Sequence, residues 1–250
     1  MRPYILISND DGVSARGINF LVDTLRPYAD ILVVAPDGPR SGGSCAITTT
    51  VPLRYTLLRK EDGLTVYSCT GTPVDCVKVA INELIERTPT VVIGGINHGD
   101  NSAVNAHYSG TMGVAYEGAM QGIPSIAFSL DDHSSNADFT PLEAAIVEIT
   151  MKVVNEGLPM FSCLNVNFPV RKEFKGIRVC RMTKSRWTKE TKSCLHPTTG
   201  KPYVWLVGNR ENMEPEAEDT DIWAMANGYV AVMPVTLDCT DYGLMKTLKF

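Results

Sequence analysis

Short apolar runs alternate with segments of helical spacing over the first two thirds of the chain. Residues 4–8 and 30–35 are apolar runs that end at turn-forming residues, which is typical of buried strands. Between them, the apolar residues of 17–25 recur at helical spacing. Apolar runs that are separated by helices predict parallel strands with both faces covered.

The same alternation continues to about residue 155. Strands are expected at 90–96 and 124–129, and a β-hairpin is expected from 51–58 and 64–69. Three further helices, each beginning near a Ser or Thr that can cap its first turn, are expected at about 72–87, 109–122 and 140–155. This βαβ succession predicts an α/β fold with a doubly wound, mostly parallel sheet.

The pattern changes after about residue 160. Strand-like pieces separated by long polar stretches are expected at 164–168, 177–181, 203–207 and 229–234. We interpret them as extra strands with a hairpin or arm. The aromatic side chains of Trp187, Tyr203 and Trp205 favour packing of this arm, against another subunit for example, over disorder.

Composition narrows the class of protein. The 250 residues carry 44% apolar and 20% charged side chains, which is ordinary for a globular chain with a large core. The net charge of −5 gives no attraction to nucleic acid or anionic membrane, although a bound cation can reverse the local sign for a small anion. Seven cysteines without a C-x-x-C pair indicate free thiols, and no targeting or membrane-spanning segment is evident, so we expect a cytoplasmic protein.

Polar residues follow three of the predicted strands. Ligands of open α/β sheets bind outside the carboxyl ends of the strands, so the loops 9–12, 40–43 and 97–101 are expected to meet there. The carboxylates Asp10 and Asp11 repel each other unless a cation lies between them. The remaining side chains are mainly hydroxyls and carboxamides, and oxygen ligands suit Mg²⁺, Mn²⁺ or Ca²⁺ better than zinc. The alternative is that Asp10-Asp11-Gly12 is only a turn.

Three weaker signals accompany this loop cluster. Ser109-Gly110-Thr111 begins a helix whose exposed N–H groups and dipole favour a phosphate, although Ser and Thr cap most helices. Arg40 can neutralise phosphate charge, or is simply solvated. Either His98 or His107 is a candidate general acid, the alternative being a surface or structural residue. Motifs for nucleoside triphosphate binding, for dinucleotide binding and for a serine nucleophile elbow are absent from the sequence.

These residues resemble the SurE (survival protein E) family of metal-dependent 5′-nucleotidases. The resemblance covers most of the chain and keeps the order of the family's motifs. The matching segments are Ser8-Asn9-Asp10-Asp11-Gly12, 33–37 with Arg40-Ser41-Gly42, 70–77, 95–101, 108–111 with Glu117-Gly118, and Gly228-Tyr229-Val230 with Pro234. His98 and Gly43 depart from the commonest pattern, which affects base and chain-length preference rather than the metal ligands.

The resemblance implies a Rossmann-like fold in a single domain spanning 1–250. Residues 1–160 would form the core that carries the site, and residues 160–250 would add strands and an oligomerisation hairpin or arm. It also implies one divalent metal ion per subunit, Mg²⁺ or Mn²⁺, and a homodimer or homotetramer. The implied metal ligands are Asp10, Asp11, Ser41 and Asn97.

The expected reaction is hydrolysis of the phosphate monoester of nucleoside monophosphates by metal-activated water. Asp10, Asn9 and Asn97 are the candidate catalytic residues. The candidates for binding phosphate or substrate are Asn101, Ser109, Gly110, Thr111 and Gly42. The alternatives are an aspartyl-phosphate phosphatase of the haloacid dehalogenase type, against which the contiguous Asp pair argues, and a non-enzymatic nucleotide or metal sensor. The preferred base, the metal used and activity on polyphosphate or oligonucleotides are left open.

Overall fold

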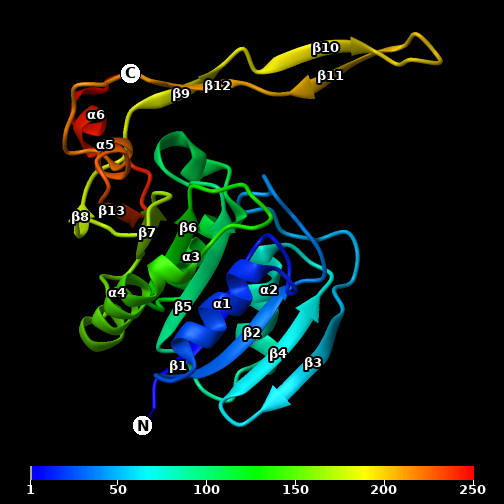
Figure 1. The fold of residues 1–250 in the computed structure, drawn as a ribbon, viewed down its shortest axis with the longest axis vertical. Helices are drawn as coiled ribbons and strands as arrows, with labels where there is room; N and C mark the ends of the chain where they lie inside the picture. The colour runs from blue at the N-terminus through cyan, green and yellow to red at the C-terminus, as the bar shows by residue number, and fades with distance from the viewer. Residues whose placement is uncertain (1) are drawn as a thin grey trace.

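A nine-stranded sheet forms the centre of the computed structural model, which describes residues 2–250 (Figure 1). Its strand order is β3-β4-β2-β1-β5-β6-β7-β13-β8. The six strands from β4 to β7 run parallel, whereas β3 and β13 pair antiparallel with β4 and β7. The bounds are β1 Tyr4–Ser8, β2 Asp30–Pro36, β3 Tyr55–Glu61, β4 Leu64–Cys69, β5 Val91–His98, β6 Ser125–Leu130, β7 Ser162–Phe168, β8 Ile177–Val179 and β13 Val230–Thr236.

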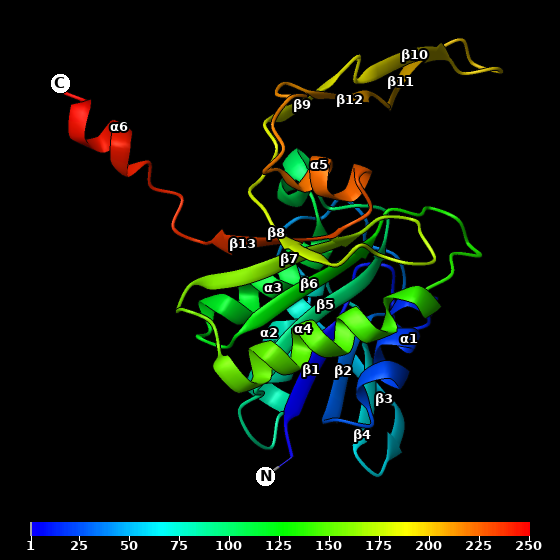
Figure 2. The same cartoon turned by 60° about the vertical axis from the view of Figure 1, so that its left-hand side comes forward.

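Helices cover both faces of this sheet, which confirms the doubly wound α/β prediction. Helices α1 (Arg16–Leu25) and α4 (Glu143–Glu156) contact each other on one face, in front of the sheet in Figure 2. Helices α2 (Pro73–Val79) and α3 (Gly110–Met120) contact each other on the opposite face. The alternation of side chains along each strand supplies both cores: Ile5 and Ile7 pack with α1 and α4, while Leu6 between them packs with α2.

Several element boundaries differ from the expected ones. The helix expected at 72–87 is α-helical only to Val79 and continues as a π-helical turn, Ala80–Leu84; the chain leaves the helix before Pro89, which disfavours helical backbone ahead of it. The first hairpin strand is Tyr55–Glu61 rather than 51–58, and Pro52 cannot donate to a ladder. The loop after β5 contains a 3₁₀ turn, Ala103–His107, and another, Thr140–Leu142, precedes α4.

The second half supplies both sheet strands and an arm. β7, β13 and β8 extend the central sheet, as the strand-like pieces predicted. The arm is built from two antiparallel pairs that reach beyond the body in Figure 1. Its base pairs β9 (Ser185–Thr188) with β12 (Asn209–Asn212), and its distal hairpin pairs β10 (Thr191–Leu195) with β11 (Pro202–Leu206).

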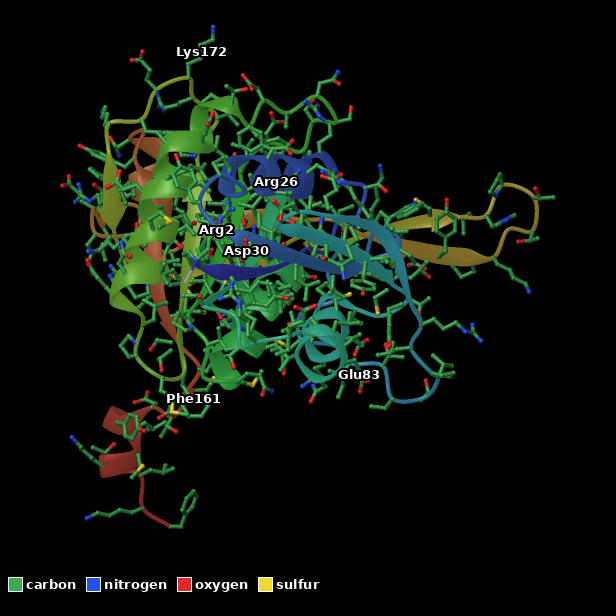
Figure 3. All side chains as sticks on the ribbon, turned by 90° about the horizontal axis from the view of Figure 1, so that it is seen from below. Arg2, Arg26, Asp30, Glu83, Phe161 and Lys172 are labelled. Carbon is green, nitrogen blue, oxygen red and sulfur yellow. The ribbon has the colours of Figure 1, made fainter. Side chains whose placement is uncertain are left out.

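Two short helices were not predicted. α5 (Asp221–Ala226) packs on β13. α6 (Tyr242–Thr247) buries none of its side chains and stands apart from the body in Figures 2 and 3. Within residues 2–250 no helix is both long and apolar enough to cross a membrane. All seven cysteines are free thiols, as expected.

Candidate functional site

The loops after β1, β2 and β5 meet at the carboxyl edge of the sheet, as the strand order requires. They line a cavity of about 390 Å³ together with the start of α3. Asp10, Asp11, Ser41 and Asn97 all contribute to its wall, and Ser109 lies beside them. The structure therefore brings the four side chains expected as metal ligands to one place.

A turn held by Asn9 presents the two carboxylates. Asn9 is fully buried; its Nδ2 donates to the Gly12 carbonyl oxygen over 3.0 Å, and the Gly12 N–H donates to its Oδ1 over 3.1 Å. Gly12 has a φ of 100°, a conformation that L side chains rarely adopt. The Arg40 N–H donates to the Asp10 carbonyl oxygen over 2.7 Å, which ties the loop after β2 to this turn.

Asp10 is withdrawn from water, and Asp11 is partly buried. Asp10 is only 4% exposed, and the Thr111 hydroxyl donates to its Oδ1 over 2.5 Å. Burial raises the pKa of Asp10 to about 6; the Thr111 hydrogen bond opposes this shift and the negative charge of Asp11 adds to it. Burial also raises the pKa of Asp11, although the His98 N–H donates to its Oδ2 over 3.3 Å. Within residues 2–250 neither carboxylate forms an ion pair with Lys or Arg, although the nearby His98 and His133 side chains act to lower the pKa of Asp11.

Neutral oxygens complete this group. Asn97 donates its Nδ2 proton to the Gly99 carbonyl oxygen over 2.8 Å, and this bond fixes its carboxamide. Its Oδ1 lies 3.5 Å from the Thr111 hydroxyl, whose proton is used in the shorter bond to Asp10, so the Asn97 oxygen is available to a ligand. The Ser41 side chain is exposed at the cavity rim.

The donor set fits a hard divalent cation. It consists of two carboxylates, a hydroxyl and a carboxamide, which are all oxygen ligands. Residues 2–250 contain no cluster of three or more His, Cys, Asp or Glu side chains able to hold a metal, so neutral oxygens have to complete the coordination. The raised pKa values of Asp10 and Asp11 fit the same conclusion, because a bound cation would favour both charged forms.

The N-terminus of α3 lies against Asp10. Ser109 caps the helix by accepting a hydrogen bond from the Met112 N–H over 3.0 Å. A Cβ at Gly110 would lie 2.8 Å from the Asp10 Cβ, and a Cβ at Gly94 in β5 would lie 2.4 Å from the Thr111 carbonyl oxygen. Both glycines therefore allow the helix to approach closely, and its first turn offers a site for an anion.

The other predicted residues take different places. Gly42 lines the cavity with an exposed backbone at φ 72°. Asn101 also lines it, but its Nδ2 donates to the Ser129 hydroxyl over 2.7 Å, so its side chain anchors the loop to β6. His98 reaches the cavity and packs edge-to-face on Phe139, with ring centroids 5.1 Å apart.

The structure differs from the sequence analysis in which histidines lie at the cavity. His107 is exposed and does not contribute to the cavity wall, whereas His133, for which no role was expected, lines it. A Cβ at Gly99 would lie 2.3 Å from His133 Cε1, so this imidazole closes over the loop after β5. No local pattern around His133 carries this information.

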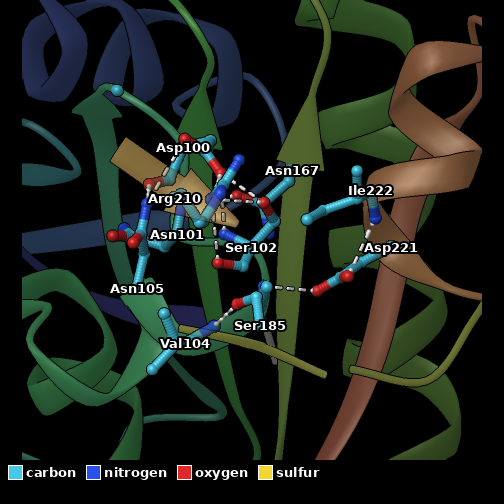
Figure 4. A network of polar contacts seen from close by, with 12 residues as sticks. Asp100, Asn101, Ser102, Val104, Asn105, Asn167, Ser185, Arg210, Asp221 and Ile222 are labelled. Atoms are coloured by element: carbon cyan, nitrogen blue, oxygen red, sulfur yellow. Dashed lines mark hydrogen bonds and ion pairs between the residues drawn. The ribbon is translucent and has the colours of Figure 1, made fainter. Parts of the chain in front are cut away.

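The structure also reveals polar contacts between the loop after β5 and the arm (Figure 4). Arg210 donates to Asp100 Oδ2 over 2.6 Å and to the Ser102 carbonyl oxygen over 3.2 Å. The Trp187 Nε1–H donates to Asn105 Oδ1 over 3.1 Å. No sequence pattern predicts these contacts, because the partners are about 80 and 110 positions apart and lie in polar segments without periodicity.

The fold and the site together define an open α/β protein whose sheet carries, at its carboxyl edge, a cavity lined by side-chain oxygens. The chain belongs to the SurE family: the sequence profile described as "Survival protein SurE" matches residues 5–189. The family resemblance of the motifs is thereby confirmed.

Full-length relatives support this membership. A protein named 5′-nucleotidase SurE from Phocaeicola vulgatus is 56% identical over 248 residues, with 99% of this chain and 96% of that protein covered. Its namesake from Bacteroides fragilis is 52% identical, with 99% and 97% covered. The crystal structure of the SurE protein from Aquifex aeolicus superimposes with a TM-score of 0.84 at 39% identity, with 99% and 98% covered.

Proposed function

We propose that the protein is a divalent-metal-dependent 5′-nucleotidase, which hydrolyses nucleoside monophosphates to nucleoside and phosphate. The observation that carries this proposal is the meeting of two desolvated carboxylates with the N-terminus of α3 in one cavity. The relatives named 5′-nucleotidase SurE, similar over their whole length, support the nucleotide as substrate.

Asp10, Asp11, Ser41 and Asn97 would hold one Mg²⁺ or Mn²⁺ ion. Such an ion polarises the phosphoryl group and lowers the pKa of water. Asn9 would act as a positioning residue, because both ends of its carboxamide are used by Gly12. Asn97, whose Nδ2 is fixed by its bond to the Gly99 carbonyl oxygen, would keep its Oδ1 available to the same ion.

The chain's own groups would bind and orient the phosphate. The N–H groups of the N-cap Ser109 and of Gly110 and Thr111 in the first turn would stabilise charge on its oxygens. The exposed backbone of Gly42 allows close approach from the opposite loop. Asp10 would orient the attacking water or accept its proton. Its Oδ1 is engaged by Thr111 and it is almost fully buried, which supports water rather than Asp10 itself as the nucleophile.

The arm supports a further part of the proposal, assembly into a homodimer or homotetramer. Its distal hairpin exposes a row of apolar side chains, among them Val204, Trp205 and Leu206 at 58%, 61% and 82% exposure. Exposed apolar surface of this kind marks an interaction site, and burying it against another subunit would stabilise the hairpin. Free thiols throughout the chain support a reducing compartment such as the cytoplasm.

Phosphate release from nucleoside monophosphates tests the proposal directly. We expect release with Mg²⁺ or Mn²⁺, its loss on chelation, and its return when the metal is added back. The control is Asn82→Ala on the surface of the π-helical turn, which should leave the rate unchanged. Absence of release across a panel of monophosphates and divalent metals, from a folded protein, would overturn the proposal.

A further inference from the structure

One wall of the candidate site is aromatic and comes from the arm. Trp187, in β9, lines the same cavity as Asp10 and Asn97, and Tyr108, which is 55% exposed, lines it as well. The cavity thus combines side-chain oxygens with two aromatic residues in its wall. None of the interactions proposed for the metal and the phosphate uses this aromatic wall.

The indole of Trp187 is held at two of its edges. Its Nε1–H donates to Asn105 Oδ1 over 3.1 Å. On another edge the backbone of Gly208 passes so close that a Cβ there would lie 3.1 Å from the indole Cε3. These two contacts set the plane of the ring at the place where Trp187 lines the cavity.

The base of the arm fixes this indole relative to the metal site. β9 pairs with β12, where Arg210 lies opposite Trp187 in the register. Arg210 in turn donates to Asp100 and Ser102 of the loop that follows Asn97. Asn105 is held on the same loop by bonds of 3.3 and 3.5 Å to Asp100. Hydrogen bonds therefore join Trp187 through Asn105 to Asp100, which lies three positions after Asn97 and also accepts from Arg210. Figure 4 shows Asp100, Asn105 and Arg210 in this network.

We propose that Trp187 is the stacking platform for the nucleobase of the substrate, an inference that rests on the proposed function and deepens it. A nucleobase offers a flat π-face, and stacking on an aromatic side chain tolerates every base. The indole N–H is already used by Asn105, so the platform has no free donor with which to distinguish base edges. The enzyme accepts all bases and favours purines, whose larger ring system stacks over more area.

Kinetics with and without a base test this proposal. Trp187→Ala raises the KM for AMP by about tenfold or more. It leaves the KM for ribose 5-phosphate, which has no base, within about twofold. The difference in KM between AMP and UMP shrinks in the same variant, and Trp187→Phe, which retains an aromatic face, keeps most of the affinity for AMP. The matched control is Tyr28→Ala, an exposed aromatic residue that precedes β2 at the opposite edge of the sheet, which leaves both KM values unchanged.

A binding measurement separates this proposal from the reaction itself. In a variant whose only tryptophan is Trp187, made by changing Trp205 and Trp223 to Phe, adenosine quenches the indole fluorescence and ribose does not. If adenosine leaves the fluorescence unchanged, or if Trp187→Ala raises the KM for AMP and ribose 5-phosphate equally, the platform is elsewhere. If adenosine quenches the fluorescence but the protein releases phosphate from no monophosphate, the proposed stacking on Trp187 stands and the proposed nucleotidase activity is overturned.

Discussion

The parallel sheet and the arm hold their residues in place by different means. Ile5, Leu6 and Ile7 of β1 are fully buried between two layers of helices, so packing fixes the backbone that ends in Asp10. The distal hairpin of the arm exposes most of its side chains, and the base of the arm is attached to the loop after β5 by polar bonds. The rigid half supplies the proposed cation ligands and the arm supplies one wall of the cavity.

Because of this difference, we expect the core half to carry out the reaction and the arm to contribute to substrate binding. Ligands for a cation need positions accurate to a fraction of an ångström, which strand ends in a packed sheet provide. A stacking surface tolerates more movement, because dispersion and stacking change gradually with ring position. Substitutions in the core half should therefore change turnover, whereas substitutions at the base of the arm should change substrate affinity and the stability of the attachment.

The largest effect is expected for Asp10→Asn. Loss of this proposed carboxylate ligand should lower kcat by about 10³-fold or more, because the cation that would neutralise charge at the reacting phosphate would be bound less tightly. Without added metal the variant should be at least as stable as the wild type, because it removes a buried carboxylate. Desolvation of this charged form is unfavourable, which is why burial raises the pKa of Asp10. Phosphate release and thermal unfolding measure the two effects. Near-normal turnover would mean that the cation ligands lie elsewhere.

Arg210→Met should give the next largest effect. It leaves the Asp100 carboxylate, whose side chain is only 8% exposed, without its cation, and breaking such a pair costs about 2–4 kcal/mol of unfolding free energy. The double variant with Asp100→Asn should recover part of this loss, because no unpaired charge remains. Urea unfolding of the four members of the cycle measures the coupling. Additive changes would show that the ion pair does not attach the arm.

The sequence predicted the core half and the existence of the arm, but not the contacts between the arm and the site, for a physical reason. Strand runs such as 30–35 and the capping Thr72-Pro73 are local signals, and the rule for strand ends placed Asp10 and Asn97 in one cavity. The contacts of Trp187 depend on the three-dimensional path of a polar segment, which has no periodicity to follow. His133 likewise reaches the cavity only because its loop folds over Gly99.

The pH dependence of metal binding tests whether Asp10, in the core half, belongs to the cation site. The pKa of Asp10 is raised from 3.8 to about 6. In the folded protein without metal, this carboxyl therefore stays protonated up to a higher pH than it does in the unfolded chain. The contribution of the Asp10 carboxyl to the free energy of unfolding is fully present below about pH 4 and is lost as the pH rises through 6. A cation reverses this loss, so the rise in Tm caused by Mn²⁺ should be larger at pH 7.5 than at pH 5.

Below pH 6 the affinity for Mn²⁺ should fall by roughly tenfold per pH unit, because one proton has to be displaced. Calorimetric titration at several pH values measures this dependence. Asp10→Asn is the control, since it should bind weakly with little dependence on pH in this range. A wild-type affinity that is flat from pH 5 to 7.5 would separate Asp10 from the cation site.

The smallest effect on unfolding is expected for Leu206→Ala, which is matched by Leu6→Ala in the core. Leu206 is 82% exposed and its loss should change the unfolding free energy of one subunit by no more than about 0.5 kcal/mol. Leu6 is fully buried, and its truncation should cost about 2–5 kcal/mol. Subunit association should be weakened more by Leu206→Ala than by Leu6→Ala, because Leu206 belongs to the exposed apolar surface and Leu6 does not. Sedimentation velocity at several concentrations would measure this, and a Leu206→Ala protein that associates as the wild type does would remove the distal hairpin from the subunit interface.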